Sequence, residues 1–269
     1  MICFINFAFQ SGAMIASAEM LLLYRKMLIT RPPEIDLAYH GIVVVFDLDD
    51  TLYPEREYMQ SGFRAAAREA IAIAGAATEA SDLAEAMTIA RDAGRNAMDE
   101  AADILGVINM AEREDLIRKM VEAYRLHSPS IVLPDDSRRS LDMLSGKGVA
   151  LALITDGRSV GQRAKISALG LERYFRPDNI YISEERGHDK RSMEPFAYMV
   201  HRYPEARGFV YVADNPEKDF LYPNIMGWQT VMLGGVYDTI HSQDMPEDKV
   251  YVPAFTIDSL SILPDLLNI

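Results

Sequence analysis

Short apolar runs that alternate with helical segments constrain the fold of this chain more than any other feature. The runs are continuous rather than alternating, and most end in polar or glycine-containing turns. They are IVVVF (42–46), VALALIT (149–155), IYIS (180–183), FVYVA (209–213) and TVML (230–233). Segments with helical spacing lie between them, for example 159–171 and 192–204. This alternation predicts a doubly wound α/β fold, in which helices cover both faces of a parallel sheet.

One long segment interrupts the alternation. Residues 55–128 contain no proline, and residues 61–102 contain sixteen alanines, the residue with the highest helix propensity. A segment of this size is too long for an ordinary crossover loop. We therefore predict an all-helical module over residues 55–129, inserted into an α/β core made of residues 41–54 and 130–269.

Residues 1–40 are predicted to be an extension outside this core. The stretch is apolar but lacks the positive region that begins a secretory signal, and polar residues interrupt its hydrophobic run. We expect an added amphipathic helix, an interface segment or a start site assigned too early.

Net charge and cysteine content exclude several classes of protein. The formal charge is −13, from 27 basic and 40 acidic residues, which argues against nucleic acid or an anionic membrane as the main partner. Cys3 is the only cysteine, so the chain has no internal disulfide and no cysteine-based metal site. We expect a cytoplasmic protein whose partner is a small molecule, and a homodimer stays open.

Candidate functional residues follow the apolar runs. Ligands of parallel α/β sheets bind beyond the carboxyl ends of the strands, so polar side chains at these positions are expected to gather at one edge. The candidates are Asp47, Asp49 and Thr51 after the first run, Thr155, Asp156 and Gly157 after the second, Lys190 after the third, and Asp214 and Asp219 after the fourth.

These residue types suit phosphoryl transfer. A carboxylate can attack phosphorus to form an aspartyl-phosphate, and a second acid two positions later can protonate the leaving oxygen. Mg²⁺ prefers oxygen ligands and would offset the repulsion between these acids and a phosphate. A hydroxyl, backbone N–H groups and a lysine can hold the phosphate oxygens.

The same residues resemble the motifs of the haloacid dehalogenase (HAD) superfamily of aspartate-nucleophile phosphatases. Its four motifs stand here in family order, as Asp47-Leu48-Asp49-Asp50-Thr51, Thr155, Lys190 and the sequence ADNPEKD with Asp214 and Asp219. The resemblance covers roughly residues 41–240. It implies a Rossmann-like core and identifies the helical insert as a type-1 cap.

The resemblance also implies a role for each residue. Asp47 would be the nucleophile and Asp49 the general acid/base. Mg²⁺ would be bound by Asp47, the backbone carbonyl of Asp49 and Asp214, with Asp219 in support. Thr155 and Lys190 would hold the phosphate, together with the turn formed by Asp156 and Gly157.

Two positions depart from the family pattern. The third motif reads KRSMEP, so Arg186 and Arg191 compete with Lys190 as its cation. An acid, Asp156, follows the threonine of the second motif, and we expect its side chain to turn away from the phosphate, towards its own turn or a substrate hydroxyl or amine.

The first motif and the residues that follow it hold three further polar side chains. Asp50 is expected to be solvated or to help position its loop. Tyr53 and Arg56 are candidates for contact with the substrate, because loops at strand ends carry binding residues.

The predicted function is a Mg²⁺-dependent phosphomonoesterase that hydrolyses a small phosphorylated metabolite through an aspartyl-phosphate. A phosphomutase of the same family is the alternative, and a receiver-type signalling protein or a non-catalytic phosphoryl-binding relative is a weaker one. A true dehalogenase is disfavoured, because displacing halide from carbon does not need Asp49.

Overall fold

The computed structural model describes residues 41–268 of the chain. The expectation for residues 1–40 therefore lies outside the described residues. Between residues 41 and 268, no helix combines the length and the apolar character that crossing a membrane requires.

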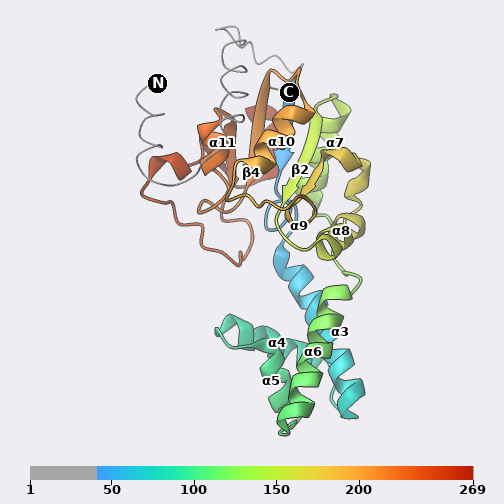
Figure 1. The fold of residues 1–269 in the computed structure, drawn as a ribbon. Helices are drawn as coiled ribbons and strands as arrows, with labels where there is room; N and C mark the ends of the chain where they lie inside the picture. The colour runs from blue at the N-terminus through green and yellow to red at the C-terminus, as the bar shows by residue number, and fades with distance from the viewer. Residues whose placement is uncertain (1–40, 269) are drawn as a thin grey trace.

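The core is a six-stranded parallel sheet (Figure 1). Its strand order is β3-β2-β1-β4-β5-β6. The bounds are β1 Ile42–Phe46, β2 Ala150–Thr155, β3 Ile180–Ile182, β4 Gly208–Ala213, β5 Gln229–Leu233 and β6 Phe255–Ile257. In the central strand β1, Val44 lies opposite Leu151 of β2 and Val210 of β4. The five predicted strands and their parallel arrangement are thus confirmed.

Helices cover both faces of this sheet, as predicted. Successive side chains of a strand point to opposite faces, so Val44 packs into one buried cluster and Val45 into another. The first cluster includes residues of α7 (Asp135–Gly146), α8 (Ser159–Ala168) and the C-terminal α12 (Leu263–Leu266). The second includes residues of α10 (Glu194–Arg202) and α11 (Leu221–Ile225). Strands β1 to β5 are therefore buried on both sides, which explains their continuous apolar sequences.

The alanine-rich segment forms four helices with a hydrophobic core of their own. They are α3 (Glu55–Ala74), α4 (Ala80–Asp92), α5 (Ala97–Ile104) and α6 (Met110–Leu126). The buried alanines of α3 belong to the same hydrophobic cluster as Met87 of α4 and Met120 of α6. Small side chains let the helices approach closely, so the alanines serve packing as well as helix propensity. The exact division of the chain into domains stays a prediction.

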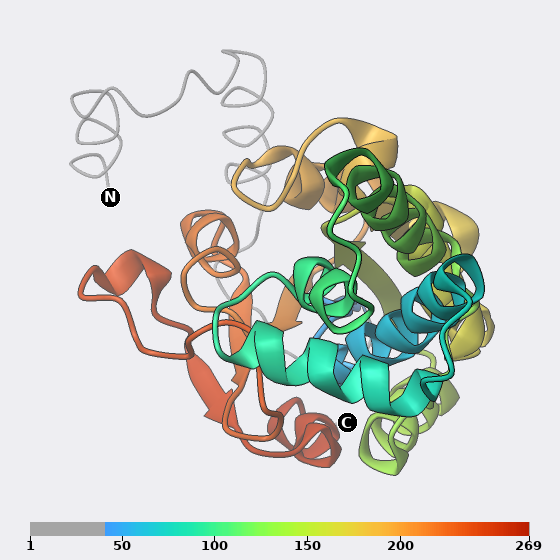
Figure 2. The same cartoon turned by 90° about the horizontal axis from the view of Figure 1, so that it is seen from below.

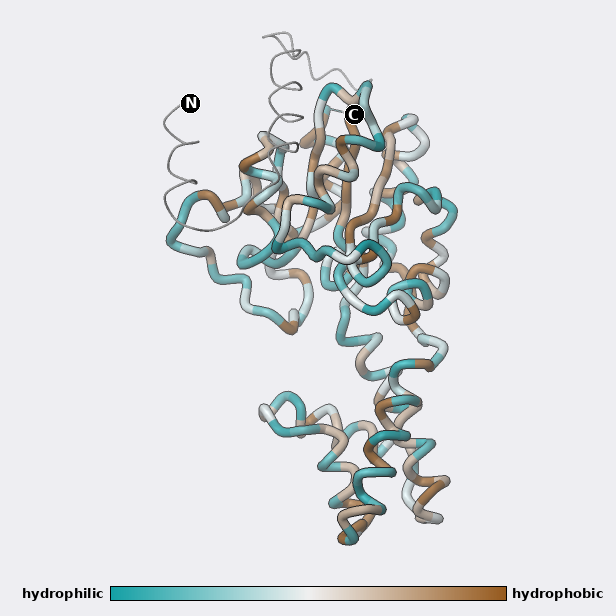
Figure 3. The backbone as a smooth tube through the Cα atoms, in the orientation of Figure 1, coloured by the Kyte–Doolittle hydropathy of each residue, from teal (hydrophilic) through white to brown (hydrophobic). Residues whose placement is uncertain are grey.

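The helical module lies at the carboxyl edge of the sheet. Residues 47–54 are all that separates β1 from α3, so α3 starts where β1 ends. Seen from below, the module covers one end of the core (Figure 2). Hydrophobic residues are concentrated in the strands, and hydrophilic residues are concentrated in the loops at the carboxyl ends of the strands (Figure 3). The polar loops of the core therefore face the module.

One strand was not anticipated. β6 pairs with β5 at the sheet edge through Met232 and Thr256. Its sequence is only three residues long, and Phe255 is 41% exposed, so it lacks the continuous apolar pattern of the central strands. Pairing with β5, rather than local sequence, makes this segment a strand.

Candidate active site

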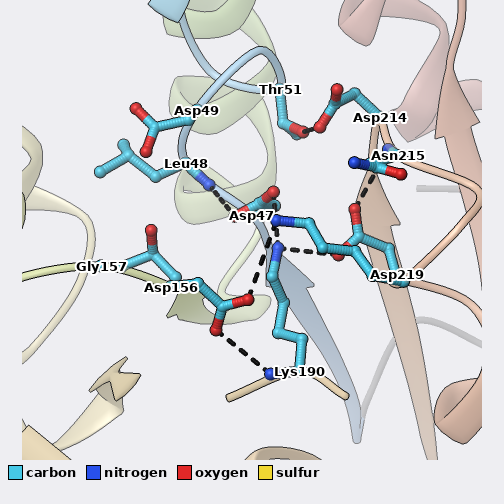
Figure 4. Close-up of polar contacts among 12 residues, drawn as sticks. Asp47, Leu48, Asp49, Thr51, Asp156, Gly157, Lys190, Asp214, Asn215 and Asp219 are labelled. Carbon is cyan, nitrogen blue, oxygen red and sulfur yellow. Dashed lines mark hydrogen bonds and ion pairs between the residues drawn. The ribbon is translucent and has the colours of Figure 1, made fainter. Parts of the chain in front are cut away.

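Asp47 begins the site at the carboxyl end of β1. Its backbone N–H donates to the carbonyl of Val212 at 2.9 Å, which continues the ladder between β1 and β4 for one more residue. Its Oδ1 accepts a hydrogen bond from the N–H of Leu48 at 2.7 Å, and its Oδ2 lies 2.7 Å from the Nζ of Lys190 (Figure 4). The carboxylate is buried and firmly oriented.

Lys190 lies at the centre of the site. Its fully buried ammonium also lies 2.8 Å from Oδ1 of Asp219. Burial alone would lower the pKa of Lys190, but the carboxylates of Asp219 and Asp47 raise it well above its usual value, so the amine is charged. The rival cations have other neighbours: Arg186 lies over the ring of Tyr198, and Arg191 lies 3.9 Å from Asp189, where it is exposed and lines a polar cavity beside Asp156. Lys190 alone of the three reaches the nucleophile position.

Three carboxylates meet beside Lys190. One oxygen each from Asp47, Asp214 and Asp219 lies within 4.8 Å of the others, and all three residues are buried. Asp214 Oδ1 accepts from the hydroxyl of Thr51 at 3.3 Å, and Asp219 Oδ2 accepts from the N–H of Asn215 at 3.1 Å. Three carboxylates and one lysine leave an excess of negative charge in a buried place.

The carboxyl pKa values show this imbalance. Burial, with the nearby carboxylate of Asp219, raises the pKa of Asp47 to about 6 although Lys190 opposes the shift. Burial and the carboxylates of Asp219 and Asp47 raise the pKa of Asp214 to about 9. A divalent cation with oxygen ligands would restore the charge balance, so this donor set fits Mg²⁺.

The raised pKa of Asp214 predicts that the stability of the metal-free protein depends on pH. The folded-state pKa of about 9 lies above the ordinary aspartate value of 3.8, so the folded state holds this proton more tightly than the unfolded state. That contribution to stability is complete below the unfolded-state pKa and is lost as pH rises through the folded-state value. We expect the Tm measured in EDTA to fall by several degrees between pH 6 and pH 9.

Asp214→Asn is the matched control for this experiment, because it removes the titrating proton and keeps the shape of the side chain. Its Tm in EDTA should fall less steeply over the same pH range. Equal slopes for the two proteins would show that Asp214 does not carry the effect.

Asp49 points away from the three carboxylates (Figure 4). Its oxygens lie 2.7 and 2.8 Å from the Nζ of Lys165, and it also accepts from the hydroxyl of Tyr53 at 2.5 Å and the amide of Gln162 at 2.9 Å. Burial would raise the pKa of Asp49, but the ammonium of Lys165 and the hydrogen bonds from Tyr53 and Gln162 together outweigh burial and lower it. The Asp49 side chain is therefore outside the candidate metal cluster, and only its backbone carbonyl remains as a predicted ligand.

Sequence reasoning missed Gln162 and Lys165. A signal was available, because both lie in the helix that follows Thr155 and are three residues apart, on the same helix face. Their partner is distant in sequence, however: 113 residues separate Gln162 from Asp49.

The loop after β2 is built as a tight turn beside Lys190. Thr155 is buried, and its Oγ1 accepts from the amide of Gln162 at 2.5 Å. Asp156 Oδ1 accepts from the backbone N–H of Lys190 at 3.2 Å, so this carboxylate braces the turn. Gly157 has a φ of 141°, which other residues rarely adopt, and its N–H donates to Ser183 at 2.9 Å.

A polar cavity of about 420 Å³ opens next to this loop. Its lining comes from the ends of several strands and includes Asp156, Gly157, Ser183, Asn215 and Lys218. Both signs of charge and several hydroxyl and amide groups are present, which suits a small polar ligand.

Asp50 is buried rather than solvated. It has a φ of 53°, and its carboxylate accepts from the N–H groups of Glu55 at 2.8 Å and Ile240 at 3.3 Å. Of the two expectations for Asp50, the structure agrees with the positioning of the loop, because these contacts tie it to the start of α3 and to the loop after β5.

Tyr53 and Arg56 have other partners in this structure. Tyr53 is buried and its hydroxyl is bound to Asp49. Arg56 forms ion pairs with Asp92 of α4 and, at 3.1 Å, with Asp238 of the loop after β5. Neither residue lines the cavity, and their contact with substrate stays a prediction.

A doubly wound parallel sheet with a helical insert, and acids at the carboxyl end of its central strand, define a Rossmann-like α/β fold with an acidic site at the edge of the sheet. The haloacid dehalogenase-like hydrolase family matches residues 43–221 of the chain. The chain belongs to this family, so the resemblance seen in its motifs is confirmed.

Relatives that are named as phosphatases align with most of the chain. A glyceraldehyde 3-phosphate phosphatase from Methanocaldococcus jannaschii is 31% identical over 232 residues, which are 84% of this chain and 96% of that protein. A ribulose-1,5-bisphosphate 5-phosphatase from Halopiger xanaduensis is 28% identical over 242 residues, which are 84% of this chain and 98% of that protein.

Solved structures share the fold at lower identity. YfnB from Bacillus subtilis, described as a HAD-hydrolase, is 20% identical with a TM-score of 0.56, covering 84% of this chain and 98% of its own. The 2-haloacid dehalogenase from Pseudomonas syringae is 22% identical with a TM-score of 0.52, covering 84% and 97%.

Proposed function

We propose that this hydrolase is a Mg²⁺-dependent phosphomonoesterase that acts on a small phosphorylated sugar or similar metabolite. The observation that carries the proposal is the contact of Asp47 with Lys190 at 2.7 Å, within a buried cluster that also holds Asp214 and Asp219. An oriented carboxylate, a charged amine and two further acids are what phosphoryl transfer to an aspartate requires. The phosphatase activity of the two relatives, which span most of the chain, supports the same conclusion.

Asp47 is the proposed nucleophile. The hydrogen bond from Leu48 to Oδ1 and the ion pair of Oδ2 with Lys190 orient its carboxylate at the sheet edge. An Asp47 oxygen forms a bond to phosphorus while the bond from phosphorus to the substrate oxygen breaks. Water then attacks the aspartyl-phosphate, releasing phosphate and restoring the carboxylate.

Lys190 and Thr155 are the proposed phosphate-binding groups. The ammonium of Lys190 offsets the negative charge that builds up on the phosphoryl oxygens, and the buried hydroxyl of Thr155 can donate to one of them. Asp47, Asp214 and the backbone carbonyl of Asp49 would hold Mg²⁺, with Asp219 in support. When bound, this ion neutralises charge between the carboxylates and the phosphate.

Asp49 is the proposed general acid/base. The ion pair with Lys165 holds Asp49 ionised in the free protein, so its carboxylate would first take up a proton, donate it to the departing oxygen, and then take one from the attacking water. Its separation from the three clustered carboxylates leaves it available for this role, since it does not have to ligate metal through its side chain.

Phosphate release from a panel of phosphorylated sugars, acids and nucleotides tests the proposed activity. The panel includes glyceraldehyde 3-phosphate and ribulose 1,5-bisphosphate, because the relatives act on these compounds. We expect release of inorganic phosphate from small sugar phosphates. Isomerisation of a sugar phosphate without release of phosphate would instead identify a phosphomutase.

Removal of divalent cations should silence the enzyme. In EDTA, the carboxylates of Asp47 and Asp219 would repel a phosphate dianion, because no metal ion offsets their charge. We expect turnover of p-nitrophenyl phosphate to fall to background and to return when Mg²⁺ is added in excess. Undiminished hydrolysis after exhaustive chelation would contradict the metal-dependent site.

A further inference from the structure

Helix α8 reaches the proposed acid/base residue with two buried side chains. Gln162 and Lys165 are 2% and 5% exposed, and both contact the carboxylate of Asp49. They are the two contacts of Asp49 that come from a distant part of the sequence, since Tyr53 lies in the same loop as Asp49. The orientation of Asp49 thus depends on how α8 packs against the first motif.

Lys165 makes the stronger of the two contacts. Its Nζ lies 2.7 and 2.8 Å from the two oxygens of Asp49, so it contacts both. The other groups around the ammonium are Oε1 of Glu55 at 3.8 Å and the ring of Tyr58, whose centroid is 4.3 Å away. A buried ion pair with contacts to both carboxylate oxygens restricts rotation of the side chain.

These neighbours place the Asp49 carboxylate on the side of the helical module. Glu55 and Tyr58 both belong to α3, the helix through which the chain enters the module. In an in-line displacement the leaving oxygen departs on the side opposite the nucleophile. With Asp47 at the sheet edge, that side faces the module, where Lys165 holds Asp49.

Gln162 connects Asp49 to the phosphate-binding loop. Its amide nitrogen lies 2.9 Å from Oδ2 of Asp49, 2.5 Å from Oγ1 of Thr155 and 2.9 Å from the carbonyl of Asp156. One side chain therefore sets the distance between the proposed acid and the proposed phosphate-binding hydroxyl.

We propose that Lys165 is a positioning residue, which acts on the reaction by holding the carboxylate of Asp49 where the leaving oxygen departs. This inference rests on the proposed phosphatase function. A purely structural ion pair between the core and α3 is the competing explanation. Buried ion pairs often add little to stability over apolar packing, which makes a role in orientation the better account of a buried lysine here.

The test compares two substrates that differ in their need for an acid. An alkyl phosphate such as glycerol phosphate has a strongly basic leaving group, which must be protonated, whereas the leaving group of p-nitrophenyl phosphate is a weak base. Lys165→Met keeps an unbranched aliphatic side chain and removes the charge. We expect the ratio of kcat/KM for the alkyl over the aryl substrate to fall about tenfold or more.

Arg163→Met is the matched control. Arg163 is a cation of the same helix, but it pairs with Glu185 at 2.7 Å, away from Asp49. The control should leave the ratio of the two kcat/KM values within about twofold of the wild type. Circular dichroism and thermal unfolding of each variant check that it is folded.

A second variant covers the case in which Lys165→Met does not fold. The double substitution Glu55→Gln with Lys165→Met removes one anion and one cation, so the net charge of the buried group is unchanged. It should show the same fall in the ratio. A ratio within twofold of the wild type in whichever variant folds, or an equal loss for both substrates, would overturn the proposal.

The test also separates this inference from the proposed function. If the wild type releases phosphate and Lys165→Met affects both substrates alike, only the role of Lys165 is lost. If the wild type releases no phosphate from either substrate, the proposed function itself fails.

Discussion

Replacing Asp47 by asparagine is expected to reduce phosphate release by about a thousandfold or more. The amide is a poor nucleophile, so the bond to phosphorus cannot form. It nevertheless matches the shape of the carboxyl group and can still accept the hydrogen bond from Leu48, which keeps the fold intact. Release from p-nitrophenyl phosphate is the measurement. Mass spectrometry of acid-quenched enzyme should find the phosphorylated protein only in the wild type.

A matched aspartate checks that this loss is specific to Asp47. Asp238 lies in the loop after β5, and its side chain is 78% exposed. Asp238→Asn should retain activity within about twofold, because an exposed ion pair contributes little. Substantial turnover by Asp47→Asn would remove Asp47 as the nucleophile.

Replacing Lys190 by methionine should cost both activity and stability. The substitution leaves Asp47, Asp214 and Asp219 buried without their cation, and breaking a buried ion pair typically costs about 3–5 kcal/mol. Loss of the charge that is proposed to bind the phosphate should also bring turnover close to background. Urea denaturation in EDTA measures the free energy of unfolding, and p-nitrophenyl phosphate measures turnover.

Lys218→Met is the control for this experiment. Its ammonium lies 3.8 Å from Asp156 and is partly exposed, so its removal should change the free energy of unfolding by less than about 1 kcal/mol. Asp47→Asn combined with Lys190→Met should regain part of the lost stability, because one buried carboxylate is removed with the lysine. If Lys190→Met were as stable as the wild type, the charge balance described for the site would be wrong.

The fold was largely predictable because strands that are buried on both faces of a sheet have continuous apolar sequences. Strands β1 to β5 are continuous apolar runs, and the alanine-rich, proline-free segment indicated the helical module. Strand β6 was missed because it lies at the edge of the sheet, where Phe255 is half-exposed. Its pairing with β5, and not a hydrophobic sequence pattern, makes it a strand.

The part of the site that could be predicted from the sequence is the set of residues that directly follow the strands. Parallel strands bring their carboxyl ends to one edge, so residues that directly follow a strand were expected to meet. Asp47 and Asp214, which end adjacent strands, do lie together. Gln162 and Lys165 could not be predicted in this way, because they lie in a helix and the direction of their side chains depends on how that helix packs.

The sequence by itself determined the layered fold, the helical insert and the gathering of acids at one edge, since these follow from hydrophobic pattern and strand order. Only the tertiary structure decided which side chains contact which. It placed Lys190, rather than Arg186 or Arg191, against Asp47, and it turned Asp49 towards Lys165. The physical reason is that an ion pair forms between atoms a few ångströms apart in space, and 116 residues of chain separate Lys165 from Asp49.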